Sequence, residues 1–216
     1  MRLLNKVVIA LLLLGPLQVQ GGEPTRYVEL LNTYLSAITT LSAGFEQITT
    51  DQTAYDATVY DGRLWLEKPN RFRVDTINPS LQTVVSDGID FWSYDEDLEQ
   101  VVISPLNEDL NQVPILLFSS DILSIQQAYN ISGYTGESDK HLLLEHFVLE
   151  PMSDLSLFHS LTLSFHLGKP VSITINATTG QITTVSLHDV TLNSAISPDR
   201  FNFIAPAGAD VIDDRS

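Results

Sequence analysis

The first long stretch with a helical hydrophobic pattern covers residues 25–46. Its apolar side chains recur at spacings of three and four residues, which places them on one face of an amphipathic α-helix. Thr25 stands where a helix N-cap is expected. The β-branched residues that begin at Ile38 lower the helix propensity somewhat. The sequence therefore predicts one helix over this range, with an apolar face of Leu31, Leu35, Ile38, Leu41 and Phe45.

From about residue 59 the apolar positions alternate with polar ones, a period of two that is typical of β-strands. Turn-forming dipeptides and the acidic run at residues 95–97 separate these segments,. Short turns between successive strands predict an antiparallel meander. We expect strands at residues 59–67, 71–77, 81–86, 89–94 and 100–104, and later at residues 131–136, 142–150, 158–167, 171–176, 181–192 and 200–203.

Between these two groups of strands, residues 114–118 and 121–129 have helical spacing. Pro114 suits the first position of a helix, and Asp121 suits the N-cap of the next one. The predicted fold class is therefore mainly β, with about eleven strands and three α-helices. The sequence contains no internal repeat, low-complexity segment or linker.

The strand predicted at residues 89–94 is apolar on both of its faces. Ile89 and Phe91 point to one side of the sheet, whereas Trp92 and Tyr94 point to the other,. On the preceding strands charged residues share this second side with Trp65, so the second side is the outer face. We interpret the outer aromatic residues as cross-strand stabilisers of the sheet, with a docking surface as the alternative.

The inner face of such a sheet is apolar, and three short helices are available to cover it. Two interpretations follow from the residues alone. The first is a core filled with side chains, the usual fate of an apolar face. The second is an incompletely closed barrel whose helices form a lid over a hydrophobic, ligand-binding cavity.

The N-terminal residues have the layout of a secretory signal. Arg2 and Lys6 precede the apolar run at residues 7–14, and Gly15 and Pro16 follow it,. This run is too short to cross a bilayer as a helix. We predict that residues 1–21 are removed as a signal peptide and that residues 22–216 form one exported domain.

The chain is strongly acidic and lacks cysteine. Eleven Lys and Arg against 27 Asp and Glu give a net charge of −16. Without Arg2 and Lys6, nine basic against 27 acidic residues give −18. This charge argues against binding to nucleic acid or to an anionic membrane surface. Because there is no cysteine, neither a disulfide nor a lipid-modified cysteine anchor is possible,.

No pattern of catalytic or metal-binding residues is present in the sequence. It lacks a G-x-S-x-G elbow, an H-E-x-x-H motif and a phosphate-binding glycine loop,. The five histidines do not have the spacing of metal ligands,. The acidic turn at residues 95–97 lacks the glycine and the distal glutamate of a calcium loop. We therefore predict a protein that is not an enzyme and that requires neither metal nor cofactor.

Seven short motifs, in order along the chain, resemble those of the periplasmic outer-membrane lipoprotein carrier family, LolA. Each is weak alone, but together they cover nearly all of the chain after the signal. They are FEQ at residues 45–47, GRLWLEKPNRF at 62–72, VSDG at 85–88, FWSY at 91–94, LEQV at 98–101, PILL at 114–117, and FNF with PAG at 201–203 and 206–208.

The resemblance implies an unclosed antiparallel barrel with a lid of three α-helices over a hydrophobic cavity. It also implies a monomeric carrier in the periplasm that takes acylated lipoproteins from an inner-membrane ABC transporter and delivers them to an outer-membrane acceptor. A periplasmic (glyco)lipid-binding or lipid-sensing protein of the same fold is the alternative. The side chains predicted to line the cavity are Leu35, Ile38, Phe45, Leu64, Leu66, Phe72, Val74, Ile89, Phe91, Leu116 and Leu117.

The chain departs from the family pattern at Lys68. The family usually has an arginine before this proline, and that arginine is thought to hold the lid closed by hydrogen bonds. Lysine keeps the charge but lacks the planar fork of donors. We therefore expect Lys68 to act as the lid latch and to hold the lid less firmly. Val113 likewise replaces the family's usual threonine.

Overall fold

The structure is a computed structural model that describes residues 23–51, 57–106, 114–137, 142–154 and 156–215. The predicted signal peptide and Val113 lie outside these residues. The elements in chain order are α1 (Glu23–Ser36), β1 (Thr40–Asp51), β2 (Thr58–Glu67), β3 (Arg71–Asn78), β4 (Gln82–Asp87), β5 (Asp90–Asp95), β6 (Gln100–Pro105), the 3₁₀ helix η1 (Pro114–Phe118), α2 (Ile122–Ala128), β7 (Tyr129–Glu137), β8 (Leu143–Pro151), β9 (Phe158–His166), β10 (Lys169–Ala177), β11 (Gln181–Leu192), the 3₁₀ helix η2 (Pro198–Phe201) and β12 (Asp210–Asp213).

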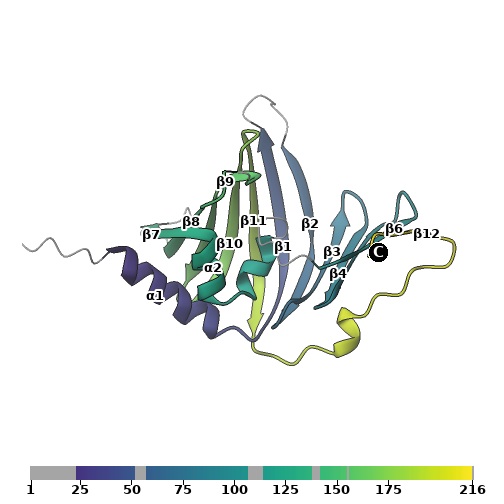
Figure 1. Cartoon of the computed structure of the whole chain (residues 1–216), viewed down its shortest axis with the longest axis horizontal. Coiled ribbons are helices and arrows are strands. Elements are labelled where there is room, and N and C mark those ends of the chain that lie inside the picture. Colours follow the sequence, from purple (N-terminus) through teal and green to yellow (C-terminus); the bar gives the residue numbers. More distant parts are fainter. Residues whose placement is uncertain (1–22, 52–56, 107–113, 138–141, 155, 216) are drawn as a thin grey trace, which may run out of the picture.

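The strands form one open sheet in the order β12-β6-β5-β4-β3-β2-β1-β11-β10-β9-β8-β7. All neighbours pair antiparallel except β12, which pairs parallel to β6. β12 and β7 are the two edges and lie at opposite ends of the molecule (Figure 1). The predicted mainly β, unclosed sheet is therefore confirmed, with twelve strands rather than eleven.

The predicted helix at residues 25–46 is wrong in its second half. Helix α1 ends at Ser36, and β1 begins at Thr40 and pairs with both β2 and β11. Leu41 and Phe45 share a face in a helix and also in a strand, because a spacing of four residues fits both periods. The pattern was therefore ambiguous, and pairing on both edges of β1 favours the strand. Thr25 also lies inside α1 rather than at its N-cap.

The predicted three-helix lid is not confirmed. The described residues contain two α-helices, and the segment predicted at residues 114–118 is the 3₁₀ helix η1. Asp121 does cap α2, since its Oδ1 accepts a hydrogen bond from Ser124 N at 2.9 Å. The strand predicted at residues 200–203 is also wrong: Pro198 opens the 3₁₀ helix η2 there, and the last strand is β12.

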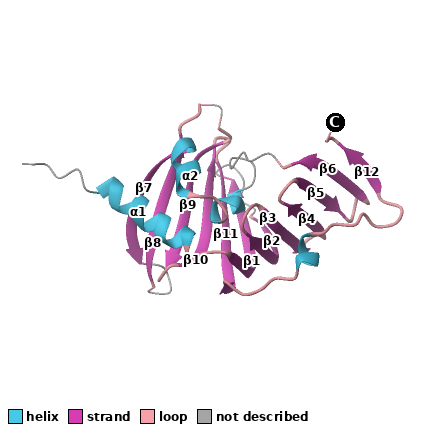
Figure 2. Cartoon of the chain, turned by 60° about the horizontal axis from the view of Figure 1, so that its bottom comes forward, coloured by secondary structure: helices cyan, strands magenta, loops and turns pink. Residues whose placement is uncertain are grey.

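Helices α1, α2 and η1 lie on one face of the sheet, over the half built from β1 and β7–β11 (Figure 2). The half that contains β3–β6 and β12 extends away from them in both views. Beneath the helices, apolar side chains from both layers form the main core. Its members include Leu31, Leu35, Ile38, Leu41, Phe45, Leu64, Leu66, Leu117, Phe118, Phe147, Leu161, Leu163 and Phe165.

A second, smaller cluster lies on the outer face, where the C-terminal segment crosses β2–β6. Phe201 of η2 is buried, as are Val85 and Val101 of the sheet. Phe203 contacts Tyr94 with a ring-centroid distance of 6.2 Å. Strand pairing places Trp65 and Trp92 on this same outer face, in line with Val85. The outward prediction for Trp92 and Tyr94 is therefore confirmed.

The C-terminal segment covers this outer face instead of leaving it open. The Arg200 guanidinium lies 4.2 Å from the centroid of the Trp65 ring, a cation–π contact,. Beyond η2, β12 pairs with β6, and Arg215 Nη1 lies 2.6 Å from Asp90 Oδ2. The outer side of strand β5 is apolar because the chain's own C-terminal segment covers it.

We predict that the outer cluster stabilises the whole fold. Phe201→Ala should lower the free energy of unfolding by about 3–5 kcal/mol, the range for truncating a buried phenylalanine. The matched control is Ile204→Ala, because Ile204 belongs to the same segment but is 87% exposed. Denaturant titration of both variants tests this. Equal stabilities for the two variants would contradict the packing of the segment onto the sheet.

Candidate functional site: the inner apolar face and its helical cover

The structure buries eight of the eleven side chains predicted to line a cavity. Val74 and Phe91 are half-buried. Ile89 is 76% exposed, so its assignment to the inner face is wrong. The eight buried residues are Leu35, Ile38, Phe45, Leu64, Leu66, Phe72, Leu116 and Leu117.

Ile89 points outward because the turn before β5 is longer than the sequence pattern indicated. Gly88 has a φ of 98°, in the left-handed region that favours glycine,. The Asp87 side chain accepts hydrogen bonds from the backbone N–H groups of Ile89 and Asp90, at 2.8 and 2.9 Å. Residues 88 and 89 therefore belong to the turn, and the strand begins one residue later at Asp90.

The buried candidates come from both layers of the molecule. Leu35, Ile38 and Leu117 come from the helical side, and Phe45, Leu64 and Leu66 come from β1 and β2. All six belong to one packed core, which joins the helical side to the sheet. Phe72 lies farther along the inner face and contacts Phe91 at a centroid distance of 6.2 Å. In this structure the helical layer packs against the inner face of the sheet.

The G-x-L-W motif on β2 contributes apolar side chains to both faces of the sheet. A Cβ on Gly62 would overlap the carbonyl oxygen of Asp75 and crowd the ring of Phe45, so β2 and β3 can pair here only without a side chain. Leu64 and Leu66 then point inward, and the intervening Trp65 points outward beneath Arg200.

Sequence reasoning missed the aromatic part of the same core. Tyr34 of α1 contacts Phe147 of β8 and Phe165 of β9, at 6.0 and 5.2 Å between centroids. Phe118 of η1 also contacts Phe165, at 6.0 Å. The alternation of apolar and polar residues in β8 and β9 could have revealed them, because it places Phe147, Phe165 and their apolar neighbours on one face of the sheet. These contacts join α1 and η1 to the sheet.

A groove of about 800 Å³ opens beside this core. It is lined by the C-terminal part of α1, the turn between β2 and β3, and the segment from η1 to α2. Leu35 and Leu116 contribute apolar surface, while Lys68 and Asp121 contribute charge. The groove therefore marks a seam between the helical layer and the sheet.

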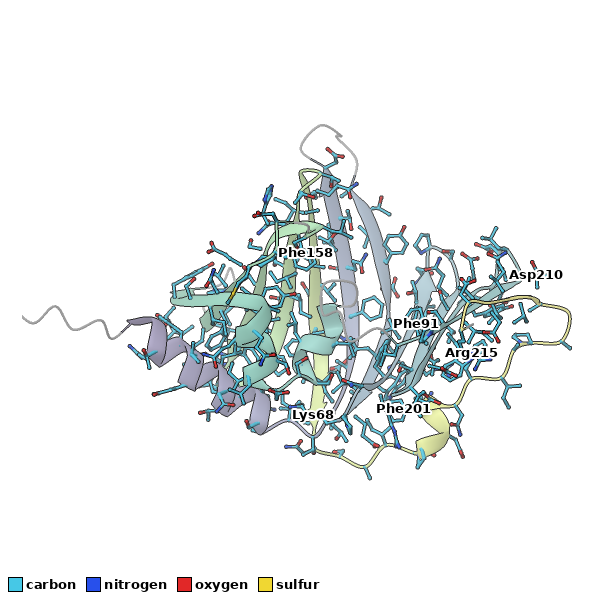
Figure 3. All side chains as sticks on the ribbon, viewed as in Figure 1. Lys68, Phe91, Phe158, Phe201, Asp210 and Arg215 are labelled. Carbon is cyan, nitrogen blue, oxygen red and sulfur yellow. The ribbon has the colours of Figure 1, made fainter. Side chains whose placement is uncertain are left out.

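Lys68 joins the two sides of this seam (Figure 3). Its Nζ donates a hydrogen bond to the backbone oxygen of Leu35 at 2.8 Å. Leu35 lies in the last turn of α1, where carbonyl groups lack intrahelical partners and favour a cation. The same oxygen accepts a bond from Ile38 N at 3.1 Å. The bond to the cover is thus made to α1 and not to the 114–129 segment.

Burial lowers the pKa of the Lys68 ammonium below its usual value, and the negative charge of Asp121 opposes this shift. The ammonium therefore loses more solvation in this seam than the nearby carboxylate restores. Holding the charged Lys68 side chain in this seam therefore costs desolvation free energy that a fully exposed lysine would not lose,.

Among the described residues, no group of three or more His, Cys, Asp or Glu side chains is arranged to hold a metal ion. In the same part of the chain, no helix has the length and apolar character needed to cross a membrane.

An open β-sheet with a helical cover on its apolar inner face defines the class of fold, and comparison with known proteins identifies the family. The family model for outer membrane lipoprotein carrier protein LolA matches residues 36–204. The outer-membrane lipoprotein carrier protein of Pseudomonas paraeruginosa is 35% identical over 212 residues, covering 98% of this chain and 99% of the relative. That of Chromohalobacter salexigens is 34% identical over 195 residues, covering 90% and 89%. This chain belongs to the outer membrane lipoprotein carrier protein family.

Solved structures share the fold at low sequence identity. An uncharacterized conserved protein from Thermus thermophilus has a TM-score of 0.53 at 13% identity and covers 88% of this chain and 98% of that one. The crystal structure of MucB also gives a TM-score of 0.53 at 13% identity, covering 87% of this chain and 66% of that one. At such identities the likeness establishes the architecture alone.

We predict that removing the Lys68 bond loosens the end of α1. In Lys68→Leu, amide hydrogen exchange at residues 35–38 should accelerate, because the Leu35 carbonyl loses one of its two donors. Lys68→Arg keeps a charged donor and serves as the matched control. Mass-spectrometric or NMR exchange measures both, with β9 as the internal reference. Unchanged exchange in Lys68→Leu would show that the bond contributes nothing to the seam.

The lowered pKa of Lys68 predicts a pH dependence of stability. Between the folded pKa and the unfolded value of about 10.4, the unfolded chain holds more protons on this lysine than the folded chain does. Stability attributable to Lys68 must therefore rise with pH through that window. Relative to Lys68→Arg, whose side chain stays charged, the wild-type midpoint in denaturant should increase up to about pH 10.5. If the difference in midpoint between the wild type and Lys68→Arg stayed constant or decreased as the pH rose, the burial of a charged Lys68 would be contradicted.

Proposed function

We propose that this protein carries acylated lipoproteins through the periplasm, with the acyl chains held on the inner apolar face of the sheet. The observation that supports this most directly is the apolar core formed between two layers, a continuous sheet and a cover of short helices. Membership of the outer membrane lipoprotein carrier protein family supports the same function. Residues 1–21 act as the export signal, and the protein acts as a monomer.

Shielding is required because acyl chains are strongly apolar. Each buried CH₂ group is worth about 0.8 kcal/mol, so one sixteen-carbon chain amounts to roughly 12 kcal/mol. A lipoprotein with up to three such chains cannot cross an aqueous compartment unprotected. A site for these chains must be large, dry and able to close again once it is empty.

The closed core explains how one site serves both states. When the helical layer moves off the sheet, acyl chains take the places of Leu35, Ile38, Leu117 and their neighbours. Apolar contacts between protein side chains are then exchanged for apolar contacts with lipid. Such an exchange changes the free energy far less than exposing either surface to water. The empty carrier avoids exposing a large apolar patch, and the loaded carrier avoids it too.

To move off the sheet, the helical layer must break two kinds of contact. The aromatic contacts from Tyr34 and Phe118 hold the cover onto β8 and β9, and the Lys68 bond holds the end of α1 to the β2–β3 turn. We propose Lys68 as the latch. Its partner is a backbone carbonyl, so the latch can re-form whatever cargo has left.

The direction of transport must come from the partners. The sequence has no phosphate-binding glycine loop, so the energy for loading comes from an inner-membrane ABC transporter. Release follows from a higher affinity at an outer-membrane acceptor. The net charge of −18 after signal removal favours basic docking surfaces on both partners,.

A lipid-binding measurement tests the proposal. Phe72 is fully buried, so a charge there would also unfold the protein. Phe91 faces the same side of the sheet, is half-buried, and lies beside the helices rather than beneath them (Figure 3). Phe91→Glu should weaken binding of a fluorescent triacylated lipopeptide by roughly tenfold or more, since a carboxylate there must be desolvated.

Ile89→Glu is the matched control, because it adds the same charge two residues away on an exposed turn. It should bind the lipopeptide like the wild-type protein. The same peptide without acyl chains should bind none of the three proteins. Wild-type affinity in a folded Phe91→Glu variant would overturn the assignment of the acyl chains to this face.

A further inference from the structure

A second hollow, of about 460 Å³, lies on the inner face beyond the apolar core. Its lining residues all come from strands β1–β4 and β11, and every one carries an uncharged hydrogen-bonding side chain. Gln47 and Thr49 belong to β1, Thr58 and Tyr60 to β2, and Gln82 to β4. In a chain with 27 acidic residues, a lining of amides and hydroxyls alone is a distinct chemical environment.

This hollow continues the candidate acyl-chain site. Along β1 the inner positions are Leu41, Ala43 and Phe45, which are buried in the core, followed by Gln47 and Thr49. The face therefore changes from apolar to polar over two residues, or roughly 7 Å of strand. The upper ends of β1 and β2 rise beyond α1 and α2 in Figure 1.

Strand pairing places most of these polar side chains beside one another, and Gln47 also pairs with Val185 of β11. Gln47 pairs with Tyr60, and Thr49 pairs with Thr58 on one side. On its other side Thr49 pairs with Thr183, and their hydroxyl oxygens are 3.0 Å apart. The lining is thus made of side chains on paired strands.

Amide and hydroxyl groups can both donate and accept hydrogen bonds. They match the N–H and C=O groups of a peptide backbone, which are the same in every sequence. A charged lining would select among cargoes by their side chains, whereas an uncharged one accepts them all. A lipoprotein changes from acyl chains to peptide at a single residue, so its binding site must change from apolar to polar over a similarly short distance.

We propose that this polar hollow binds the peptide backbone that follows the lipid-modified cysteine of the cargo. The acyl chains occupy the apolar face at the level of Phe45, and the first peptide residues lie along Gln47, Thr49 and Tyr60. This assignment rests on the proposed carrier function and adds a second subsite to it. The site contributes affinity for the peptide without selecting its sequence.

Site-specific cross-linking tests the position of the peptide. p-Benzoyl-phenylalanine replaces Gln47 on the inner face or, as the matched control, Ile48, the next residue, which points to the outer face. Both proteins are loaded with a synthetic tripalmitoyl-S-glyceryl-cysteine lipopeptide that has a ten-residue tail. The position-47 protein should cross-link the first residues of the tail, and the position-48 protein should not. Cross-links to the acyl chains or the glyceryl group, or none from position 47, would overturn the proposal.

Binding measurements separate this subsite from the acyl site. The double variant Gln47→Leu, Thr49→Val should bind the lipopeptide about tenfold more weakly, which corresponds to about 1.4 kcal/mol. It should bind tripalmitoyl-S-glyceryl-cysteine methyl ester, which has no peptide, like the wild-type protein. Equal changes for both lipids, or no change for either, would overturn the peptide subsite. If the wild-type protein bound neither lipid, the carrier function itself would fail, and the subsite with it.

Discussion

The burial of the apolar sheet face beneath a layer of short helices is the constraint on which this structure depends. A twelve-stranded sheet that closed into a barrel would have no open edges, but this one stays open between β12 and β7. Its inner face must therefore be covered by something other than its own strands. Helix α1, η1 and α2 provide that cover over one half. The cover is attached by aromatic contacts and by the hydrogen bond from Lys68 to the end of α1.

The outer face has the opposite arrangement, and this difference makes the sheet a stable platform. The C-terminal segment crosses the outer face of β2–β6, buries Phe201 and continues into β12 at the edge. It is part of the same sheet that it covers, so it cannot leave without breaking strand pairing. The cover of the inner face makes no strand pairs with β1–β6. Movement is therefore expected on the inner side, where the proposed function requires it.

The elements that sequence reasoning predicted well have a single periodicity. Strands β2–β6 and β8–β11 lie close to the ranges that the period of two and the turn residues predicted, and Phe91 and Trp92 were assigned to the correct faces. The failures have local physical causes. Leu41 and Phe45 fit a helix and a strand equally, Ile89 is drawn into the turn by hydrogen bonds to Asp87, and β12 has only four residues. A short edge strand gains its stability from its neighbour β6, which no local pattern reveals.

By itself, the sequence determined the class of this protein: its acidic charge, its absence of cysteine, its alternating strands and the family motifs from Phe45 to Gly208. These properties are local or compositional, so they can be read without coordinates. Only the tertiary structure decided that the helical layer and the sheet share one core, that Lys68 bonds to Leu35, and that a polar hollow continues the apolar face. Each of these depends on residues far apart in the chain, and packing between layers brings them together.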